Sequence, residues 1–137
     1  MTPETLFSLG NMLAVLGWLS LLALPFRPAA NLWLAGRIIP GLLAVTYLVL
    51  IIWRVPGSDG GFASLAAVAR LFADPWLLLA GWLHYLCFDL FIGAWICRHA
   101  AARGLSRWRV LPWLPLTFLF GPVGLLGYLA MLGRRQA

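Results

Sequence analysis

Charged residues are scarce in this sequence, and lysine is absent. Asp, Glu, Lys and Arg together make up 10% of the 137 residues, whereas a soluble domain carries about a quarter. All ten basic residues are arginine, and they stand singly or in pairs at the ends of apolar runs. That placement is typical of anchors at helix ends, so the net charge of +6 does not indicate nucleic-acid binding.

Cysteine is scarce as well. Cys87 and Cys97 are the only two, and on one predicted helix they lie about 15 Å apart, too far for a disulfide. Metal ligands are equally few, because no further His, Glu or Cys is expected at membrane depth on another span. We therefore expect neither a metal site nor another cofactor.

Hydrophobic residues are abundant: they make up 63% of the chain, and the mean hydropathy is +0.92. These values predict an all-α integral membrane protein with a single domain over residues 1–137. The apolar runs predict four transmembrane helices, at about residues 6–24, 34–53, 74–98 and 110–132. The run from Phe62 to Phe72 is too short to span a bilayer and predicts an interfacial helix. It is either a linker or a lid or side wall over the central site.

The fourth predicted span contains three prolines and three glycines. A helix is expected to kink or break near Phe120-Gly121-Pro122 and leave carbonyls without N–H partners. Gly124 and Gly127 would allow a close approach of helices. An even number of spans places both termini on one side. The excess of arginine on the other side (Arg27, Arg37, Arg98, Arg103, Arg107 and Arg109) favours that side as cytoplasmic, with both termini outside. The arginine-only, Gly/Ala-rich composition favours a bacterial inner membrane.

The segment from Asp74 to Arg98 carries two ionisable residues, His84 and Asp89, near its middle. A charge at membrane depth costs at least ~2.5–3.5 kcal/mol, so such a residue is expected to face protein or water and to serve function. With about 100° per residue, Asp89 falls on a row with Gly81 and Gly93, which predicts that it faces other helices. His84 lies about 140° away. The two side chains are expected to bracket one inward face without touching.

Two interpretations of this pair remain open. A neutral Asp89 could donate a proton to an epoxide or double bond, with His84 as base or orienting partner. Alternatively, both could only hydrogen-bond neighbouring helices and fix their register, with four candidate partners: Asn11, Thr46, Tyr47 and Thr117. The aromatic side chains nearby suit a long apolar ligand. The candidate ligand-binding residues are Asn11, Tyr47, Trp82, Tyr85, Phe88 and Trp95.

The stretch AGWLHYLCFDLFIGAWI resembles the neoxanthin-synthase-like family of small membrane proteins, typified by the plant abscisic-acid-deficiency-four protein. The resemblance continues through FASLAAVARLF, through LTFLFGPVGLLGYL and through the spacing of Asn11, Trp18 and Pro25. It implies four transmembrane helices. It also implies a link to the conversion of violaxanthin to neoxanthin, an isomerisation in which an epoxide opens and an allene forms.

These observations lead to two hypotheses. In the first, the protein binds or isomerises a carotenoid or another isoprenoid-type lipid, with Asp89 and His84 as the catalytic residues. In the second, it is a non-catalytic membrane scaffold or an accessory subunit of a lipid-modifying enzyme. The expected partner is a membrane lipid rather than a nucleic acid. Four short spans barely enclose a long ligand, which leaves a homodimer open.

Overall fold

The computed structural model describes residues 1–23 and 28–133. Within them the chain is helical and has no strand, as predicted. Three helical segments are long and apolar enough to cross a membrane: Pro3–Leu22, Ala29–Gly57 and Pro75–Ala102. The predictions that involve Pro25 and Arg27 concern residues outside the described ranges.

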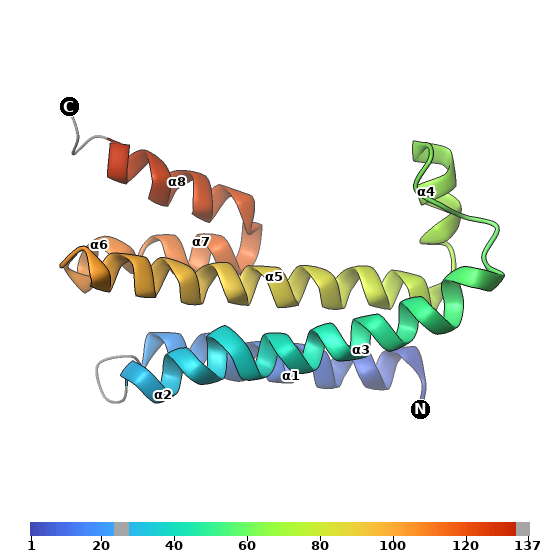
Figure 1. Ribbon diagram of the computed structural model, residues 1–137, viewed down its shortest axis with the longest axis horizontal. Helices are drawn as coiled ribbons and strands as arrows, with labels where there is room; N and C mark the ends of the chain where they lie inside the picture. The colour runs from blue at the N-terminus through green and yellow to red at the C-terminus, as the bar shows by residue number, and fades with distance from the viewer. Residues whose placement is uncertain (24–27, 134–137) are drawn as a thin grey trace.

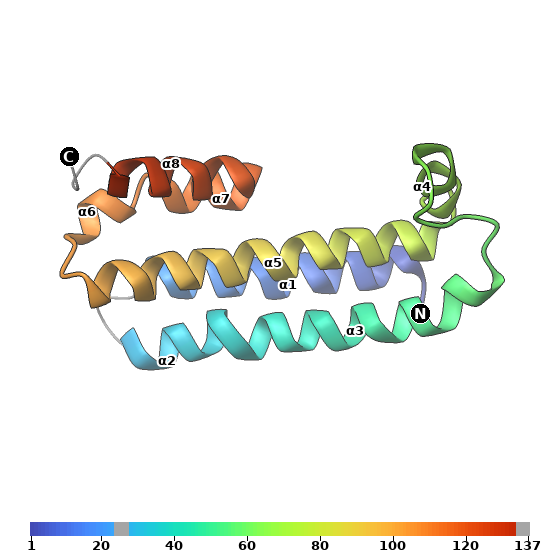
Figure 2. The ribbon, with the colours of Figure 1, turned by 45° about the horizontal axis from the view of Figure 1, so that its top comes forward.

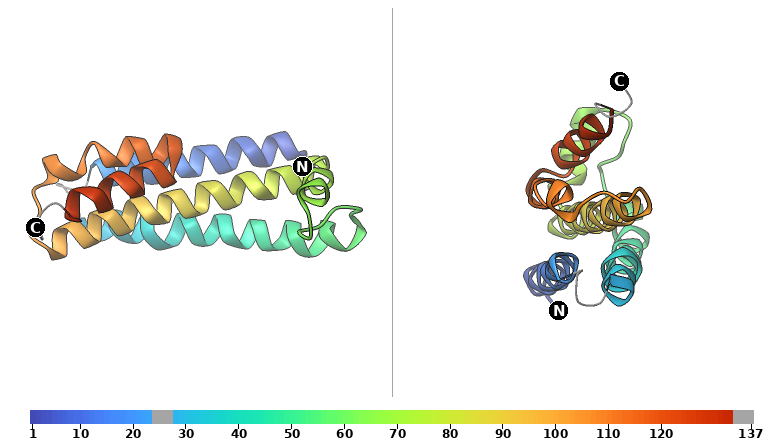
Figure 3. Two further views of the ribbon diagram at one scale, coloured as in Figure 1. Left: turned by 90° about the horizontal axis from the view of Figure 1, so that it is seen from above. Right: turned by 90° about the vertical axis from the view of Figure 1, so that its left-hand side faces the viewer.

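Helix α5 (Pro75–Ala102) is the centre of the molecule. Twelve of its 28 residues are buried, against five of the 20 residues of α1 (Pro3–Leu22). Seen from the end of the bundle, α5 lies between α1 and α3 (Ile39–Arg54) on one side and α7 and α8 on the other (Figure 3). The burial of α5 follows from this position, because helices cover it from two sides.

The second span is one helical rod built from four segments: α2 (Pro28–Trp33), the π-helix η1 (Leu34–Ile38), α3, and the short 3₁₀ helix η2 (Val55–Gly57). The π-helical turn ends just before Pro40. A proline inside a helix has no N–H, and its ring collides with the carbonyl four residues earlier. A wider turn at that position relieves the collision, so the span continues through Pro40 without a sharp kink.

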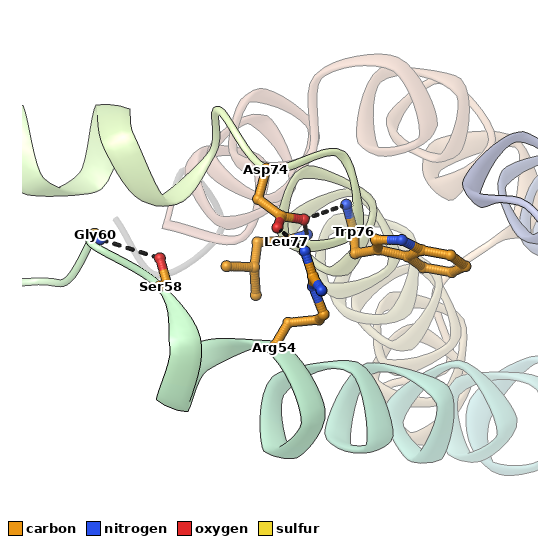
Figure 4. A network of polar contacts seen from close by, with 6 residues as sticks. All are labelled: Arg54, Ser58, Gly60, Asp74, Trp76 and Leu77. Atoms are coloured by element: carbon orange, nitrogen blue, oxygen red, sulfur yellow. Dashed lines mark hydrogen bonds and ion pairs between the residues drawn. The ribbon is translucent and has the colours of Figure 1, made fainter.

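The start of α5 is fixed by a polar network at one end of the bundle (Figure 4). Asp74 is the N-cap, and its carboxylate accepts hydrogen bonds from the N–H groups of Trp76 (2.8 Å) and Leu77 (3.3 Å). It also forms an ion pair with Arg54 of α3. Burial alone would raise the pKa of Asp74, but these three interactions outweigh it and hold the pKa below its ordinary value. The network therefore ties the beginning of α5 to the end of α3.

A short helix is present where one was predicted, as α4 (Leu65–Leu71) with Ser64 as its N-cap; its position at the membrane interface stays a prediction. It stands across the direction of the long helices at the end of the bundle where α3 meets α5 (Figures 1 and 2). If the long helices cross a bilayer, this orientation places α4 along the membrane surface. Leu71 is its only buried residue.

The predicted fourth span is not confirmed. Its residues form α6 (Arg107–Val110), α7 (Trp113–Phe120) and α8 (Pro122–Gly133), and at ~1.5 Å per residue none reaches the ~30 Å of a hydrocarbon core. The break predicted at Phe120-Gly121-Pro122 is present, and α8 doubles back along α7 (Figure 1). Gly124 and Gly127 do allow close packing, but their neighbours are Thr117 and Trp113 of α7. Length and hydropathy predicted a span here, but the chain breaks at Gly121-Pro122 and turns back on itself.

This hairpin changes the expected topology. The prediction placed the end of the fourth span opposite the loop around Arg103. In the structure, α8 ends beside α6, at the same end of the bundle as that loop, while α1 begins at the other end (Figure 1). The hairpin reaches only about halfway along α5, so the first half of α5 is left uncovered on that side (Figure 2).

Candidate functional site

Asp89 is buried near the middle of α5, with 8% of its surface exposed. The prediction that it faces protein is therefore confirmed. It lies directly against the turn of the α7–α8 hairpin: a Cβ atom at Gly121 would come within 2.3 Å of Asp89 Oδ1 and 2.9 Å of its Cγ. The absence of a side chain at Gly121 is what allows the turn to approach the carboxyl group.

The same turn supplies polar atoms next to this carboxyl group. In an unbroken helix, the carbonyls of Phe118 and Leu119 would accept from residues 122 and 123. Because Pro122 has no N–H and ends the helix, these carbonyls are released. The Tyr85 hydroxyl donates to both, at 3.3 and 3.2 Å. Tyr85 thus holds the hairpin turn against α5, one helical turn away from Asp89.

The carboxyl group itself is incompletely bonded. Asp89 Oδ2 is buried and has no hydrogen-bond partner among the described residues. A buried polar atom left without a partner costs free energy, ~1–3 kcal/mol, and calls for an explanation.

The side chains proposed to fix helix register mostly bond elsewhere. Thr117 donates to Trp113 O at 2.7 Å, and Thr46 donates to Leu42 O at 3.0 Å. Asn11 Oδ1 accepts from Trp82 Nε1 at 3.0 Å. A purely structural role for Asp89 would require hydrogen bonds to such side chains, and none of these three donates to Asp89 in the described part of the chain.

Aromatic side chains of α1 and of the first half of α5 lie next to one another, in the part of α5 that the hairpin does not reach. Phe7, Trp82 and Tyr85 follow one another, with ring centroids 5.7 and 5.3 Å apart. Phe7 and Trp82 are 43% and 39% exposed, and both line a cavity of about 350 Å³ between the beginnings of α1 and α5. This row leads along α5 toward the hairpin turn. Of the predicted ligand-binding residues, the structure brings Asn11, Trp82 and Tyr85 together here.

His84 does not share this site, so the expectation that it brackets one inward face with Asp89 is wrong. It is exposed, and its ring lies beside Phe88 (4.6 Å between centroids) and Tyr47 (5.7 Å). His84 and Tyr47 line a separate pocket of about 210 Å³, toward α3 and α4. Phe72, which follows α4, also lines it and packs on Gly81. The α4 segment is thus a side wall of the His84 pocket rather than of the Asp89 site.

Trp95 belongs to a third cluster. It stacks on His99 with 4.8 Å between centroids, and His99 Nδ1 and the hydroxyl of Tyr128 are 2.7 Å apart in a hydrogen bond. Tyr128 of α8 is completely buried. The predicted third span ended at residue 98 and left His99 out, so this pair was missed; the four-residue spacing of Trp95 and His99 was the available signal. The cluster fastens α8 to α5.

The chemistry open to this arrangement is proton transfer. The described residues hold no group of three or more His, Cys, Asp or Glu side chains that could bind a metal. Asp89 places one carboxyl group with a free oxygen at mid-length of the central helix. In its neutral form it can donate a proton, and in its ionised form it can accept one.

Comparison with known families identifies one match. Residues 5–128 match the family model described as ABA DEFICIENT 4-like. The match covers most of the chain and confirms the resemblance that was predicted from the sequence motifs. No curated protein and no solved structure matches the chain significantly.

Proposed function

The chain belongs to the ABA DEFICIENT 4-like family, and from that premise we propose that it is a membrane isomerase of an isoprenoid-type lipid, with Asp89 as its acid. The observation that carries the proposal is the buried oxygen Oδ2 of Asp89, which has no hydrogen-bond partner among the described residues. A substrate oxygen or double bond beside it would relieve that cost and be positioned for protonation.

The ligand enters from the bilayer along the uncovered half of α5. The exposed aromatic rings of Phe7 and Trp82 and the adjoining cavity of about 350 Å³ support this route. A pocket of that size and apolar character suits part of a long hydrocarbon ligand. Glu4 also lines this cavity, and the hydrogen-bonded amide of Asn11 and the Tyr85 hydroxyl are polar groups farther along the route. They would orient a ligand that carries few polar atoms.

The proposed reaction on an epoxide needs only one carboxyl group. Asp89 donates its proton to the epoxide oxygen, the C–O bond breaks, and a hydroxyl group and a carbocation delocalised over the polyene form. The Asp89 carboxylate then removes a proton from the neighbouring carbon, and the electron pair of that C–H bond forms the new double bond. The carboxyl group is regenerated, and no oxidant or reductant is consumed.

We assign the proton transfers to Asp89 alone. His84 was predicted as a base or orienting partner, but it lines a pocket beside Tyr47 that Asp89 does not line. A single acid that returns to its starting state is sufficient for an isomerisation. Substitution of His84 therefore tests whether the two residues cooperate.

We also propose that the end of the bundle that holds α6 and the end of α8 faces the cytoplasm. Arg37, Arg98, Arg103, Arg107 and Arg109 lie at this end. At the other end the described arginines are two, Arg54 and Arg70. The positive-inside rule then places the start of α1 outside. Reporter fusions at the two ends should report opposite sides of the membrane; the same side for both would contradict the hairpin topology.

The decisive experiment uses the purified full-length protein. Lipids that co-purify are extracted and identified by mass spectrometry, and the protein is then incubated with violaxanthin and with a carotenoid hydrocarbon that lacks an epoxide. We expect isomerisation of the epoxide only, and a loss of about 10²–10⁴-fold in the rate with Asp89→Asn. His84→Gln, the matched control on the same helix, should retain the rate.

Two results would refute the proposal. Undiminished turnover by Asp89→Asn would exclude the acid mechanism. Only bulk phospholipid in the extract, together with no turnover of any isoprenoid by the wild-type protein, would favour the scaffold or accessory-subunit alternative.

A further inference from the structure

A second cavity lies far from Asp89, at the end of the bundle that holds α6. Its volume is about 400 Å³, which is within the range of small-molecule sites. It lies between the end of α1, the last turns of α5, α6 and the beginning of α7. Leu21, Cys97, Val110 and Leu114 are among the apolar residues that line it, and Arg107 is the one charged side chain among the described residues that does.

The positive charge at the end of the bundle that holds α6 is not balanced by acidic side chains of the chain. The sequence has four acidic residues, all of them described. Glu4, Asp59 and Asp74 lie at the opposite end, and Asp89 lies at mid-length of α5. Five described arginines, including Arg107, lie at the end that holds α6. Their counter-ions must therefore come from outside these side chains.

Arg107 is held at the rim of the cavity. Its Nη2 donates to the carbonyl of Leu22, at the end of α1, at 2.5 Å. A guanidinium group has five N–H donors in a planar fork that matches phosphate oxygens, and this bond uses one of them. Trp108, the next residue, is 77% exposed, as expected for an aromatic side chain at the level of lipid headgroups.

We propose that this cavity is a binding site for an anionic phospholipid. An acyl chain occupies the apolar space between α1, α5 and α7, and the phosphate of the headgroup binds Arg107. The apolar lining accounts for the chain, and the excess of arginine accounts for the negative headgroup. The site is separate from the proposed isomerisation site and does not depend on it.

The test titrates the detergent-purified full-length protein with phosphatidylglycerol and, separately, with phosphatidylcholine of the same acyl chains, with native mass spectrometry as the readout. The wild-type protein should bind the anionic lipid more tightly. Arg107→Gln should weaken binding of the anionic lipid about fivefold, the effect expected for one arginine near a headgroup, and leave the zwitterionic lipid unchanged. Arg70→Gln, at the opposite end of the molecule, is the matched control.

A second variant tests the cavity without removing a charge. Ala101 is exposed and lines the cavity, so Ala101→Phe fills it while leaving the core intact. This variant should weaken both lipids. Inorganic phosphate at millimolar concentration should not displace the bound lipid.

Three results would overturn the proposal. Equal losses for Arg107→Gln and Arg70→Gln would show diffuse attraction rather than a site. Unchanged lipid binding by Ala101→Phe would show that the acyl chain does not occupy the cavity. Full displacement of the bound lipid by inorganic phosphate would show that the site binds phosphate alone and not a phospholipid.

Discussion

Substitution of Gly121 by alanine is the sharpest test of the geometry around Asp89. The three atoms nearest to a Cβ at this position all belong to the Asp89 carboxyl group, at 2.3, 2.9 and 3.0 Å. Contacts this short are not tolerated, so either the carboxyl group or the hairpin turn must move. Because Asp89 is buried, it has little room to withdraw.

The expected cost is that of overpacking a core, about 1–3 kcal/mol. The cost should depend on Asp89 itself. In an Asp89→Ala background the three contacting atoms are gone, and Gly121→Ala should then be close to neutral. The double-mutant cycle therefore predicts a coupling energy of about 1–3 kcal/mol between the two positions.

The measurement is reversible unfolding of the purified protein in mixed micelles, followed by circular dichroism, for the wild-type protein, both single variants and the double variant. Gly41→Ala serves as a control, because a Cβ at Gly41 would meet nothing within 4 Å. If Gly121→Ala costs the same with and without Asp89, the carboxyl group does not lie against the hairpin turn, and the proposed site is misplaced.

Three further predictions concern the packing of the long helices. Asp74→Asn should abolish an acid-dependent loss of stability. The pKa of Asp74 in the folded protein lies below its ordinary 3.8, so the carboxylate contributes its full stability above pH 3.8 and loses it as the pH falls through the folded-state pKa. The melting temperature should therefore fall with acid in the wild-type protein and not in the variant. Gly93→Ala places a Cβ 2.6 Å from the Trp18 ring and should lower the free energy of unfolding by about 1–3 kcal/mol; an unchanged value would contradict the packing of α1 on α5. Tyr128→Phe removes the hydroxyl bonded to His99 and should lower the free energy of unfolding by about 1 kcal/mol. The double variant with His99→Ala should lose less than the sum of the losses of the two single variants.

The hydrophobic pattern was enough to predict an all-helical membrane protein and the positions of its three long helices. Asp74 and Pro75 predict where α5 begins, because a side-chain cap and a proline at the first helical position both favour a helix start. The burial of Asp89 was predictable from its row of small neighbours. These features depend on local sequence and on the high cost of exposing polar groups to lipid.

The number of spans was not predictable in the same way. Residues 110–132 have the length and hydropathy of a span, and the break at Pro122 was recognised. Whether the chain continues in the same direction after a break or turns back depends on what the second half packs against. Here Gly124 fits against Thr117, and Tyr128 is buried against α5 through its bond with His99, so the chain turns back.

The sequence alone determined that an acid lies at mid-length of a central, protein-facing helix, because the helical period and the cost of burying charge act within one segment. The tertiary structure decided what surrounds that acid. The α7–α8 hairpin brings Gly121 onto Asp89 and leaves His84 on another side of α5 with Tyr47. Periodicity gives the direction of a side chain from its own helix, but its neighbours depend on the path that the rest of the chain takes around it.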